Sequence, residues 1–421
     1  MSLRVLSGTD VERISSKFEP IELQCLMAQV FDAVTSLASN SNSKNPPLAG
    51  RSNTPRPATQ TPHRTTISTE NHHILFMPAR MDAGPAEYSD SSVRASGTSV
   101  KIVSVPKASS TGGLPATTLV IDEHNGSVKA MVNARKLTAL RNATGPLVYF
   151  LTFKSVLSLP NTGSLLSTSL TFTNGTPRRI VAFGAGNQIE AHVNLYLRFF
   201  HGIQKCAIVN RTANDRCKSL IKRLSSSFPQ VQFTPLENVS DATEIEEAVS
   251  SAGVFICATS SRVPLFPSHW VRAGTQIVLV GSYTPEMQEI DTDLVKRATS
   301  PQFQGRESNA KPLLIVDSWD ACAKEAGELI KANVSRDDVW ELGEMLPRDS
   351  SGRLDLGHLT TLLLSKEAME PLDMDRQPDC AGPVTIFKSV GIGLQDVAIA
   401  SAVVQKAEEL GIGTIVNGYD D

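Results

Sequence analysis

The sequence has no excess of one charge and no long hydrophobic run. Its 40 Lys and Arg residues nearly balance 43 Asp and Glu residues, which gives a formal net charge of −3. That balance argues against a nucleic-acid partner, because nucleic-acid-binding proteins usually carry a basic excess. No uncharged apolar stretch reaches about 18 residues, so the sequence predicts no membrane-spanning helix and no membrane partner.

Closely spaced cysteines and an apolar leader are also missing. The six cysteines are scattered and form no CxxC pair, which favours reduced thiols over a disulfide framework or a zinc site, and we expect no metal. Residues 1–20 lack the apolar segment of a secretory signal, so we expect a cytoplasmic protein. At about 150 residues per domain, a chain of 421 residues predicts two or three domains.

The first third of the chain reads as one helix followed by strands. Apolar residues recur at helical spacing over 20–38, and 39–62 is a Ser-, Asn- and Pro-rich segment that predicts a loop or linker. Asn125-Gly126 lies between two apolar runs and is a strong β-hairpin signal. Together with short apolar runs, this predicts a largely antiparallel sheet with strands at 72–79, 99–106 and 117–123.

From Arg179 onward, apolar strands alternate with helical segments. A helix is predicted at 136–153, and 155–178 and 346–380 are expected to be irregular surface segments. Continuous apolar runs are typical of strands buried on both faces of a parallel sheet, and the intervening helices predict right-handed βαβ units. The five predicted strands lie within residues 178–186, 205–212, 252–260, 275–282 and 312–318, and an amphipathic helix ends the segment 385–411.

A glycine turn between a strand and a helix is the first candidate binding motif. Gly184 permits a tight turn, and Gly186 lets a pyrophosphate approach the backbone at the start of the helix. Asn187 and Gln188 complete the candidate cofactor-binding turn. Ile189 stands where the motif usually has Gly or Ala, and a glycine turn of an unrelated α/β protein is the alternative reading.

The end of the second strand favours NADP(H) over NAD(H). An NAD site usually places an acidic side chain there to bind the ribose hydroxyls. This chain has Asn210, Arg211 and Thr212 instead. A neutral side chain followed by a guanidinium suits a 2′-phosphate. The alternative is that Arg211 is an ordinary surface arginine.

Two further strand ends carry small polar residues. Thr259 and Ser260 follow one apolar strand, and Ser282 follows the next. Loops at the carboxyl ends of parallel strands line the ligand crevice of open α/β sheets, so we expect Thr259 and Ser260 to line the cofactor crevice and Ser282 to lie near the nicotinamide. For either segment alone, an ordinary loop is an equal alternative.

The ordered set of motifs resembles the ornithine cyclodeaminase and mu-crystallin family from about residue 60 to the C-terminal helix. No single motif is decisive, and the set is specific because it keeps its order along the chain. The matching pieces are His63-Arg64, Met77–Ala79, the strand around Lys101, Gly112–Pro115, the run that ends at Arg141, Gly184–Gln188 with His192, Asn210–Thr212, Gly281–Asp291, Val316–Ser318, Glu341–Glu344 and Ile386–Asp396.

The resemblance implies an α/β protein with a Rossmann-type doubly wound parallel sheet plus an α+β domain for substrate binding and dimerisation. On this basis we expect the substrate domain at 1–143 with 385–421 returning to it, the NAD(P)-binding domain at 144–384, and a homodimer. By motif match, the catalytic substrate-carboxylate grip falls on Arg64, Lys101 and Arg141. Three cations around one carboxylate suit a small amino or imino acid, and a desolvated lysine can also supply a proton.

This sequence departs from the family pattern at three places. Tyr283 stands where ornithine cyclodeaminases have a catalytic aspartate, Asn133-Ala134 replaces an Asp-Gly pair, and Asn142 replaces a threonine. Glu286 or Glu289 on the same loop could take over from the missing aspartate. The segments 39–62, 155–178 and 346–380 are unusual insertions.

We therefore expect an NADP-dependent reductase of a ketimine or imino-acid carboxylate, with hydride transfer to the C=N carbon. The alternatives are a redox-neutral, ornithine-type amino-acid cyclodeaminase and a dinucleotide-dependent small-molecule binding protein of the mu-crystallin type. The cyclodeaminase must activate a distal amine, for which a tyrosine is less suited than an aspartate.

Overall fold

The computed structural model describes residues 2–42, 59–82, 95–107, 114–157, 175–237, 242–300, 312–364, 370–371, 380 and 382–419. The chain divides into two compact units. Unit 1 comprises Met1–Gly145, Leu346–Thr360 and Ile392–Asp421, and unit 2 comprises Pro146–Met345 and Thr361–Gly391. These bounds differ from the predicted domain limits chiefly at 346–360 and 385–391, which fall in the other unit.

Unit 1 is built on a seven-stranded sheet in which both ends of the chain take part. The strand order is β17-β1-β6-β5-β4-β3-β2; neighbouring strands are antiparallel except β1 and β6, which are parallel. The strands are β1 (Leu3–Leu6), β2 (Thr65–Ser68), β3 (His72–Met81), β4 (Gly97–Pro106), β5 (Ala116–Ile121), β6 (Val128–Asn133) and β17 (Thr414–Val416).

The predicted hairpin joins β5 and β6. Gly126 has a φ of 78°, a left-handed conformation that glycine adopts without steric cost. The side chain of Asn125 accepts a hydrogen bond from the backbone N–H of Ser127. The three predicted N-terminal strands and this hairpin are confirmed.

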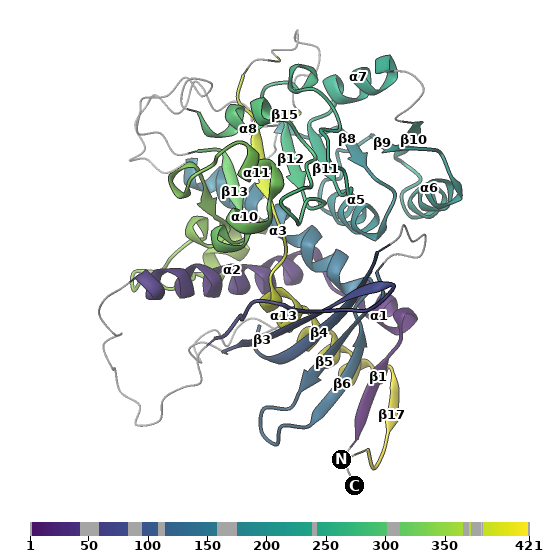
Figure 1. Cartoon of the computed structure of the whole chain (residues 1–421), viewed down its shortest axis with the longest axis vertical. Helices are drawn as coiled ribbons and strands as arrows, with labels where there is room; N and C mark the ends of the chain where they lie inside the picture. The colour runs from purple at the N-terminus through teal and green to yellow at the C-terminus, as the bar shows by residue number, and fades with distance from the viewer. Residues whose placement is uncertain are drawn as a thin grey trace. The chain divides into compact units, whose positions relative to one another are not determined.

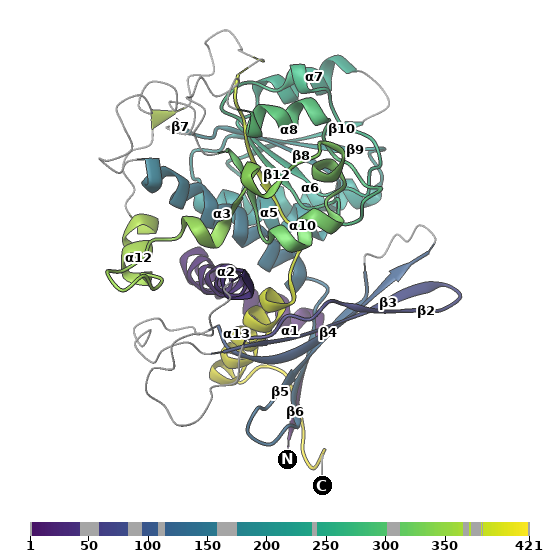
Figure 2. The ribbon, with the colours of Figure 1, turned by 60° about the vertical axis from the view of Figure 1, so that its left-hand side comes forward.

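One face of this sheet is covered by α13 (Gly393–Leu410), which packs on β3, β4 and β5 (Figures 1 and 2). Most of its residues are buried, and it ends at Gly411, whose φ of 64° forms a left-handed C-cap. Helix α2 (Pro20–Asn42) packs against α13. Helix α1 (Gly8–Ser15) precedes α2 along the chain. Helix α3 (Leu137–Leu157) follows β6.

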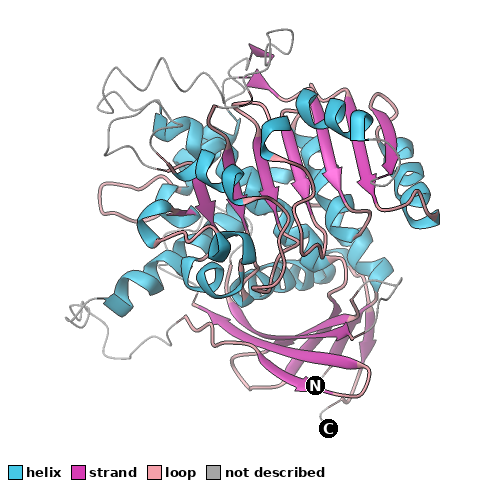
Figure 3. Ribbon diagram, turned by 45° about the horizontal axis from the view of Figure 1, so that its top comes forward, coloured by secondary structure: helices cyan, strands magenta, loops and turns pink. Residues whose placement is uncertain are grey.

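Unit 2 contains an eight-stranded sheet in the order β10-β9-β8-β11-β12-β16-β13-β14, with every neighbouring pair parallel (Figure 3). The strands are β8 (Arg179–Phe183), β9 (Lys205–Asn210), β10 (Gln232–Glu237), β11 (Val254–Cys257), β12 (Gln276–Leu279), β13 (Leu314–Val316), β14 (Trp340–Glu341) and β16 (Thr385–Lys388). The order reverses direction at β8 and β11, which is the switch point where doubly wound sheets bind ligands at their carboxyl ends.

Helices connect these strands and cover the sheet. They are α5 (Asn187–Phe199), α6 (Asp215–Ser227), α7 (Ala242–Ser251), α8 (Thr292–Thr299), α10 (Trp319–Glu325) and α11 (Gly327–Lys331), with short helical turns at Ser268–Trp270, Arg336–Asp338 and Leu342–Met345. A further helix, α12 (Leu356–Leu364), has residues in both units. A two-residue pair, β7 (Gly175–Thr176) and β15 (Glu370–Pro371), completes the assignment. None of the described helices is long and apolar enough to cross a membrane.

The α/β fold class and all five predicted parallel strands are confirmed. The sequence patterns missed β10, β14 and β16, which are short or partly polar. Within the predicted loop 39–62, α2 continues to Asn42, and 43–58 lies outside the described residues. Helix α12 corrects the expectation that 346–380 is irregular throughout, because its apolar run forms a helix; 365–369, 372–379 and the excursion 158–174 also lie outside the described residues.

Candidate functional site

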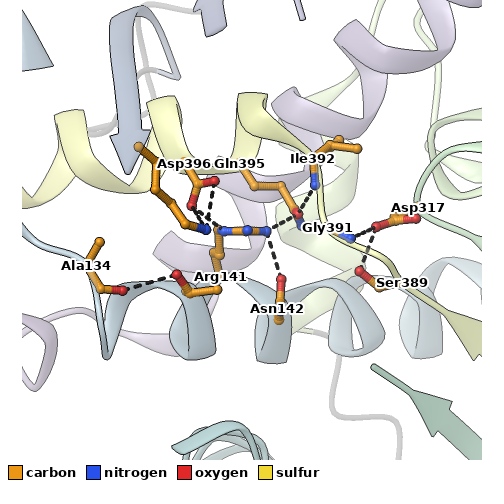
Figure 4. Close-up of polar contacts among 11 residues, drawn as sticks. Ala134, Arg141, Asn142, Asp317, Ser389, Gly391, Ile392, Gln395 and Asp396 are labelled. Carbon is orange, nitrogen blue, oxygen red and sulfur yellow. Dashed lines mark hydrogen bonds and ion pairs between the residues drawn. The ribbon is translucent and has the colours of Figure 1, made fainter. Parts of the chain in front are cut away.

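Two of the predicted catalytic cations meet on one buried carboxylate in unit 1. Arg141 donates from Nε to Asp396 Oδ1 at 2.6 Å (Figure 4). Lys101 Nζ lies 3.2 Å from Asp396 Oδ2. Lys101 and Arg141 have exposed fractions of only 3% and 2%. A buried charge is tolerated when it is paired and hydrogen-bonded, and the three groups satisfy this condition for one another.

Strand alternation and helix capping place these side chains. Lys101 lies on β4 and pairs with Thr118 on β5, and both residues are on the buried face of the sheet. Asp396 lies in the first turn of α13, next to Gln395, whose Oε1 accepts hydrogen bonds from the backbone N–H of Ile392 and from Arg141 Nη1. Arg141 is therefore held by three acceptors, the third being Asn142 Oδ1 at 2.8 Å.

Burial sets the charge state of this cluster. Desolvation lowers the pKa of Lys101 to about 8, although Asp396 opposes the shift; Arg141 and the half-buried Arg64 lower it further. A lysine with this pKa is still mostly protonated at pH 7 and releases its proton more readily than an exposed lysine. The structure therefore gathers Arg64, Lys101 and Arg141 in one electrostatic neighbourhood, and their role as a substrate grip stays a prediction.

The glycine turn in unit 2 has the features of a dinucleotide-binding loop. Gly184 follows β8 with a φ of 113°, and a Cβ there would lie 2.9 Å from the carbonyl oxygen of Ala258. Gly186 is the N-cap of α5 and provides no side-chain cap. The N–H groups of the first turn, to which Asn187 and Gln188 belong, thus have no capping side chain, an arrangement that suits a phosphate. The residues present fit a nicotinamide dinucleotide.

An arginine that the motif analysis missed lies against this turn. Arg216, on α6, donates from Nε to the carbonyl oxygen of Ala185 at 2.9 Å, and its Nη2 lies 3.6 Å from the point where a Cβ on Gly186 would be. At the end of β9, Asn210 Nδ2 donates to the carbonyl oxygen of Thr212. Arg211 and Thr212 are exposed. The sequence signal that could have identified Arg216 was its position as a second basic residue shortly after Arg211.

The ends of β11 and β12 are joined by a buried carboxylate. Glu289 accepts hydrogen bonds at Oε1 from the Thr259 backbone N–H (2.7 Å) and hydroxyl (2.9 Å), and at Oε2 from the Gly281 N–H (2.8 Å). Ser282 is buried and its hydroxyl donates to Met287 O, whereas Ser260 is exposed. The predicted residues Thr259 and Ser282 therefore share one hydrogen-bonded corner, and Ser260 points to solvent.

The acids that could replace the family aspartate differ in environment. Glu289 is fully buried and engaged by the backbone of two strand ends, so its oxygens are already occupied. Glu286 is exposed, and hydrogen bonds lower its pKa, with the largest effect from the side chain of Thr284. Tyr283 is half-buried. Within the described ranges, no group of three or more His, Cys, Asp or Glu residues could hold a metal ion.

Comparison with known proteins relates the chain to one family. The model of the ornithine cyclodeaminase/mu-crystallin family matches residues 174–358. The ketimine reductase mu-crystallin of Rattus norvegicus is 24% identical over 362 residues, which cover 85% of this chain and 88% of that protein. The Delta(1)-pyrroline-2-carboxylate reductase of Colwellia psychrerythraea is 25% identical over 54% of this chain and 59% of its own length.

A solved structure shares the fold. The Delta(1)-pyrroline-2-carboxylate reductase of Thermococcus litoralis, in complex with NADH and L-proline, has a TM-score of 0.60 and 20% sequence identity, and the match covers 98% of this chain and 99% of that one. The resemblance predicted from the ordered motifs is confirmed.

Proposed function

We propose that this chain, a relative of the ornithine cyclodeaminase/mu-crystallin family, is an NADPH-dependent reductase of a small ketimine carboxylate. The single observation that carries this proposal is the buried pair of cations, Lys101 and Arg141, with hydrogen-bonding capacity left for an anion. Asp396 neutralises one of their charges, and half-buried Arg64 adds another cation nearby. The excess positive charge suits one substrate carboxylate.

The geometry of Arg141 supports a carboxylate ligand. Its Nε and Nη1 donate to protein acceptors, whereas Nη2 has no protein acceptor among the described residues. Among the residues that the structure describes, Lys101 Nζ donates to Asp396 alone. An ammonium has three protons to donate. The unused N–H groups of the two side chains can bind a carboxylate by charge-assisted hydrogen bonds.

The chemistry then divides between binding and proton supply. A bound nicotinamide dinucleotide supplies the hydride that reduces the C=N carbon. Arg141 and Lys101 hold the neighbouring carboxylate and so fix the orientation of that carbon. Lys101, with a pKa of about 8, can deliver a proton to the substrate nitrogen and completes the addition of one hydride and one proton to the double bond.

NADPH is the proposed cofactor because basic side chains flank the glycine turn and the end of β9. Arg216 touches the turn itself, and the exposed Arg211 follows the strand that carries the ribose-binding position. A guanidinium binds phosphate in a bidentate way, whereas Asn210 provides no carboxylate for a ribose 2′-hydroxyl.

The loop after β12 favours reduction over cyclodeamination. Removing ammonia from a diamino acid requires a group that takes a proton from the distal amine, whose pKa is about 10. A tyrosine such as Tyr283 is a weak base at neutral pH. Both oxygens of the Glu289 carboxylate already accept hydrogen bonds from Thr259 and Gly281. A ketimine already contains the C=N bond and needs no such base.

We also propose that unit 1 forms a homodimer through the face of its sheet opposite Lys101. Val100, Leu119 and Met131 lie side by side across β4, β5 and β6, and Met131 keeps 37% of its surface exposed. An apolar row on the solvent side of a sheet indicates an interaction surface. Sedimentation equilibrium should report twice the chain mass, and Leu119→Asp should return the protein to a monomer.

A substrate panel tests the proposed reaction. NADPH absorbance should fall with Δ1-pyrroline-2-carboxylate or Δ1-piperideine-2-carboxylate and stay constant with ornithine. Conversion of ornithine to proline and ammonia without net NADPH consumption would instead establish the cyclodeaminase. Tight NADPH binding with no turnover of any ketimine would favour a binding protein.

A further inference from the structure

A buried group of three charges in unit 2 has no part in the reaction described above. Lys388, Glu289 and Glu328 are each fully buried. Lys388, on β16, lies 2.8 Å from Glu328 on α11 and donates a hydrogen bond of 2.5 Å to the carbonyl oxygen of Ser282. Burying ionisable groups is costly unless opposite charges are paired, and here one ammonium compensates two carboxylates.

Glu289 connects this group to the ends of two neighbouring strands. Its Oε1 accepts from the N–H and hydroxyl of Thr259, after β11, and its Oε2 accepts from the N–H of Gly281, after β12. Both carboxylate oxygens thus receive backbone donors. Only an ionised carboxylate offers two pure acceptors, because a protonated acid or an amide turns one of them into a donor.

The corner that Glu289 holds leaves no room for adjustment. A Cβ on Gly281 would lie 2.1 Å from the Thr259 carbonyl oxygen and 2.4 Å from Glu289 Oε1. Lys388 binds the next carbonyl, that of Ser282. The backbone of residues 281 and 282 is therefore fixed by a carboxylate on its N–H side and by an ammonium on its carbonyl side.

We propose that Glu289 is a positioning residue that holds the ends of β11 and β12 in the geometry required by the nicotinamide ring of the dinucleotide, with Lys388 and Glu328 as its electrostatic support. This inference rests on the proposed dinucleotide binding, because Thr259 is expected to line the cofactor crevice and Ser282 to lie near the nicotinamide. Glu289 itself is buried beneath them and acts through their backbone.

The charge balance makes this corner sensitive to pH. Burial raises the pKa of Glu289 to about 7; Lys388 opposes the shift, Glu328 adds to it, and the Thr259 hydrogen bonds lower it. Burial would lower the pKa of Lys388, but Glu328 and Glu289 raise it, so Lys388 stays charged. As pH falls through 7, Glu289 becomes protonated and loses one acceptor, and affinity for the nicotinamide ring should fall.

The effect on folding has the opposite sign. The folded-state pKa of Glu289 lies above its ordinary value of 4.5, so the folded state binds the proton more tightly than the unfolded chain. The stability that this group contributes is present below pH 4.5 and is lost as pH rises through 7. The ionised carboxylate is therefore retained at a cost to stability, which is typical of a functional role.

Binding measurements with Glu289→Gln test the proposal. NADPH is compared with 2′-phospho-ADP-ribose, which lacks the nicotinamide ring, and Glu246→Gln on the exposed face of α7 is the matched control. We expect Glu289→Gln to weaken NADPH binding about tenfold or more, since it disrupts charge-assisted hydrogen bonds. Binding of 2′-phospho-ADP-ribose should stay within about twofold, and the control should match the unmodified protein with both ligands.

The outcomes separate this inference from the proposed function. Equal NADPH affinity of folded Glu289→Gln and unmodified protein would overturn the positioning role and leave the reductase proposal intact. Failure of the unmodified protein to bind NADPH would overturn both. If Glu289→Gln does not fold, the test uses the unmodified protein at two pH values. Its affinity for NADPH, divided by its affinity for 2′-phospho-ADP-ribose, should fall from pH 8 to pH 6. A constant ratio would refute the positioning role.

Discussion

Replacing Asp396 by Asn removes the carboxylate shared by Lys101 and Arg141 while preserving the size of the side chain. Asp396 is 2% exposed and lies 2.6 Å from Arg141 Nε and 3.2 Å from Lys101 Nζ. Removing one partner from a buried ion pair typically costs about 3–5 kcal/mol, because the remaining charge is left without compensation. Here two cations lose the same partner, so we expect a loss of unfolding free energy within or above this range.

Urea unfolding measures this loss, and Asp293→Asn is the matched control. Asp293 pairs with Lys296 at 3.1 Å on the surface of α8, where its side chain is 75% exposed. Such surface pairs contribute about 1 kcal/mol or less. If Asp396→Asn costs no more than Asp293→Asn, Asp396 does not stabilise the cation cluster and the reasoning is refuted.

The pH dependence gives the loss a specific signature. Lys101 has a pKa of about 8, below its ordinary 10.5, so the unfolded chain binds more protons between these values and this group makes stability rise with pH across that window. Below pH 8, Asp396 compensates the charges of both Lys101 and Arg141. Above pH 8, Lys101 has lost its proton, so Asp396 compensates mainly Arg141. The difference in stability between the unmodified protein and Asp396→Asn should therefore shrink as pH rises through 8. A difference that grows would contradict the assignment.

Other variants probe the remaining features. Lys101→Ala should lose most turnover while NADPH binding, measured by fluorescence, survives; joint loss of both would remove it from the substrate grip. Arg211→Ala should weaken NADPH binding much more than NADH binding, and equal affinity of the unmodified protein for both cofactors would refute the preference. Tyr283→Asp should produce activity toward ornithine that the unmodified protein lacks, if an acid at this position is what cyclodeamination requires. Gly281→Ala should lower the melting temperature and NADPH affinity together, because its Cβ would lie 2.1 Å from the Thr259 carbonyl oxygen.

Local sequence signals predicted the parts of the fold that depend on neighbouring residues. Asn125-Gly126 specified a hairpin because Gly126 accepts a positive φ. Continuous apolar runs marked the central strands of the parallel sheet, which are buried on both faces. By contrast, β16 inserts between β12 and β13, and such pairing between distant segments leaves no local pattern.

The candidate site was predictable where a motif carried it and not where contacts across the fold created it. Lys101 and Arg141 were found by resemblance, but their shared partner Asp396 lies 295 and 255 residues away along the chain. An acidic residue on the apolar side of a C-terminal helix was the available signal. Arg216 and Glu289 likewise acquire their contacts only when separate strand ends come together.

The central claim is hydride transfer from NADPH to a ketimine carbon next to a carboxylate. The most direct measurement uses NADPH deuterated at the transferred position, Δ1-pyrroline-2-carboxylate as substrate, and mass spectrometry of the product. The account predicts proline that carries one deuterium at the α-carbon, formed in equal amount to the NADPH oxidised. Absence of deuterium in the product, or no NADPH oxidation while ornithine yields proline and ammonia, would contradict it.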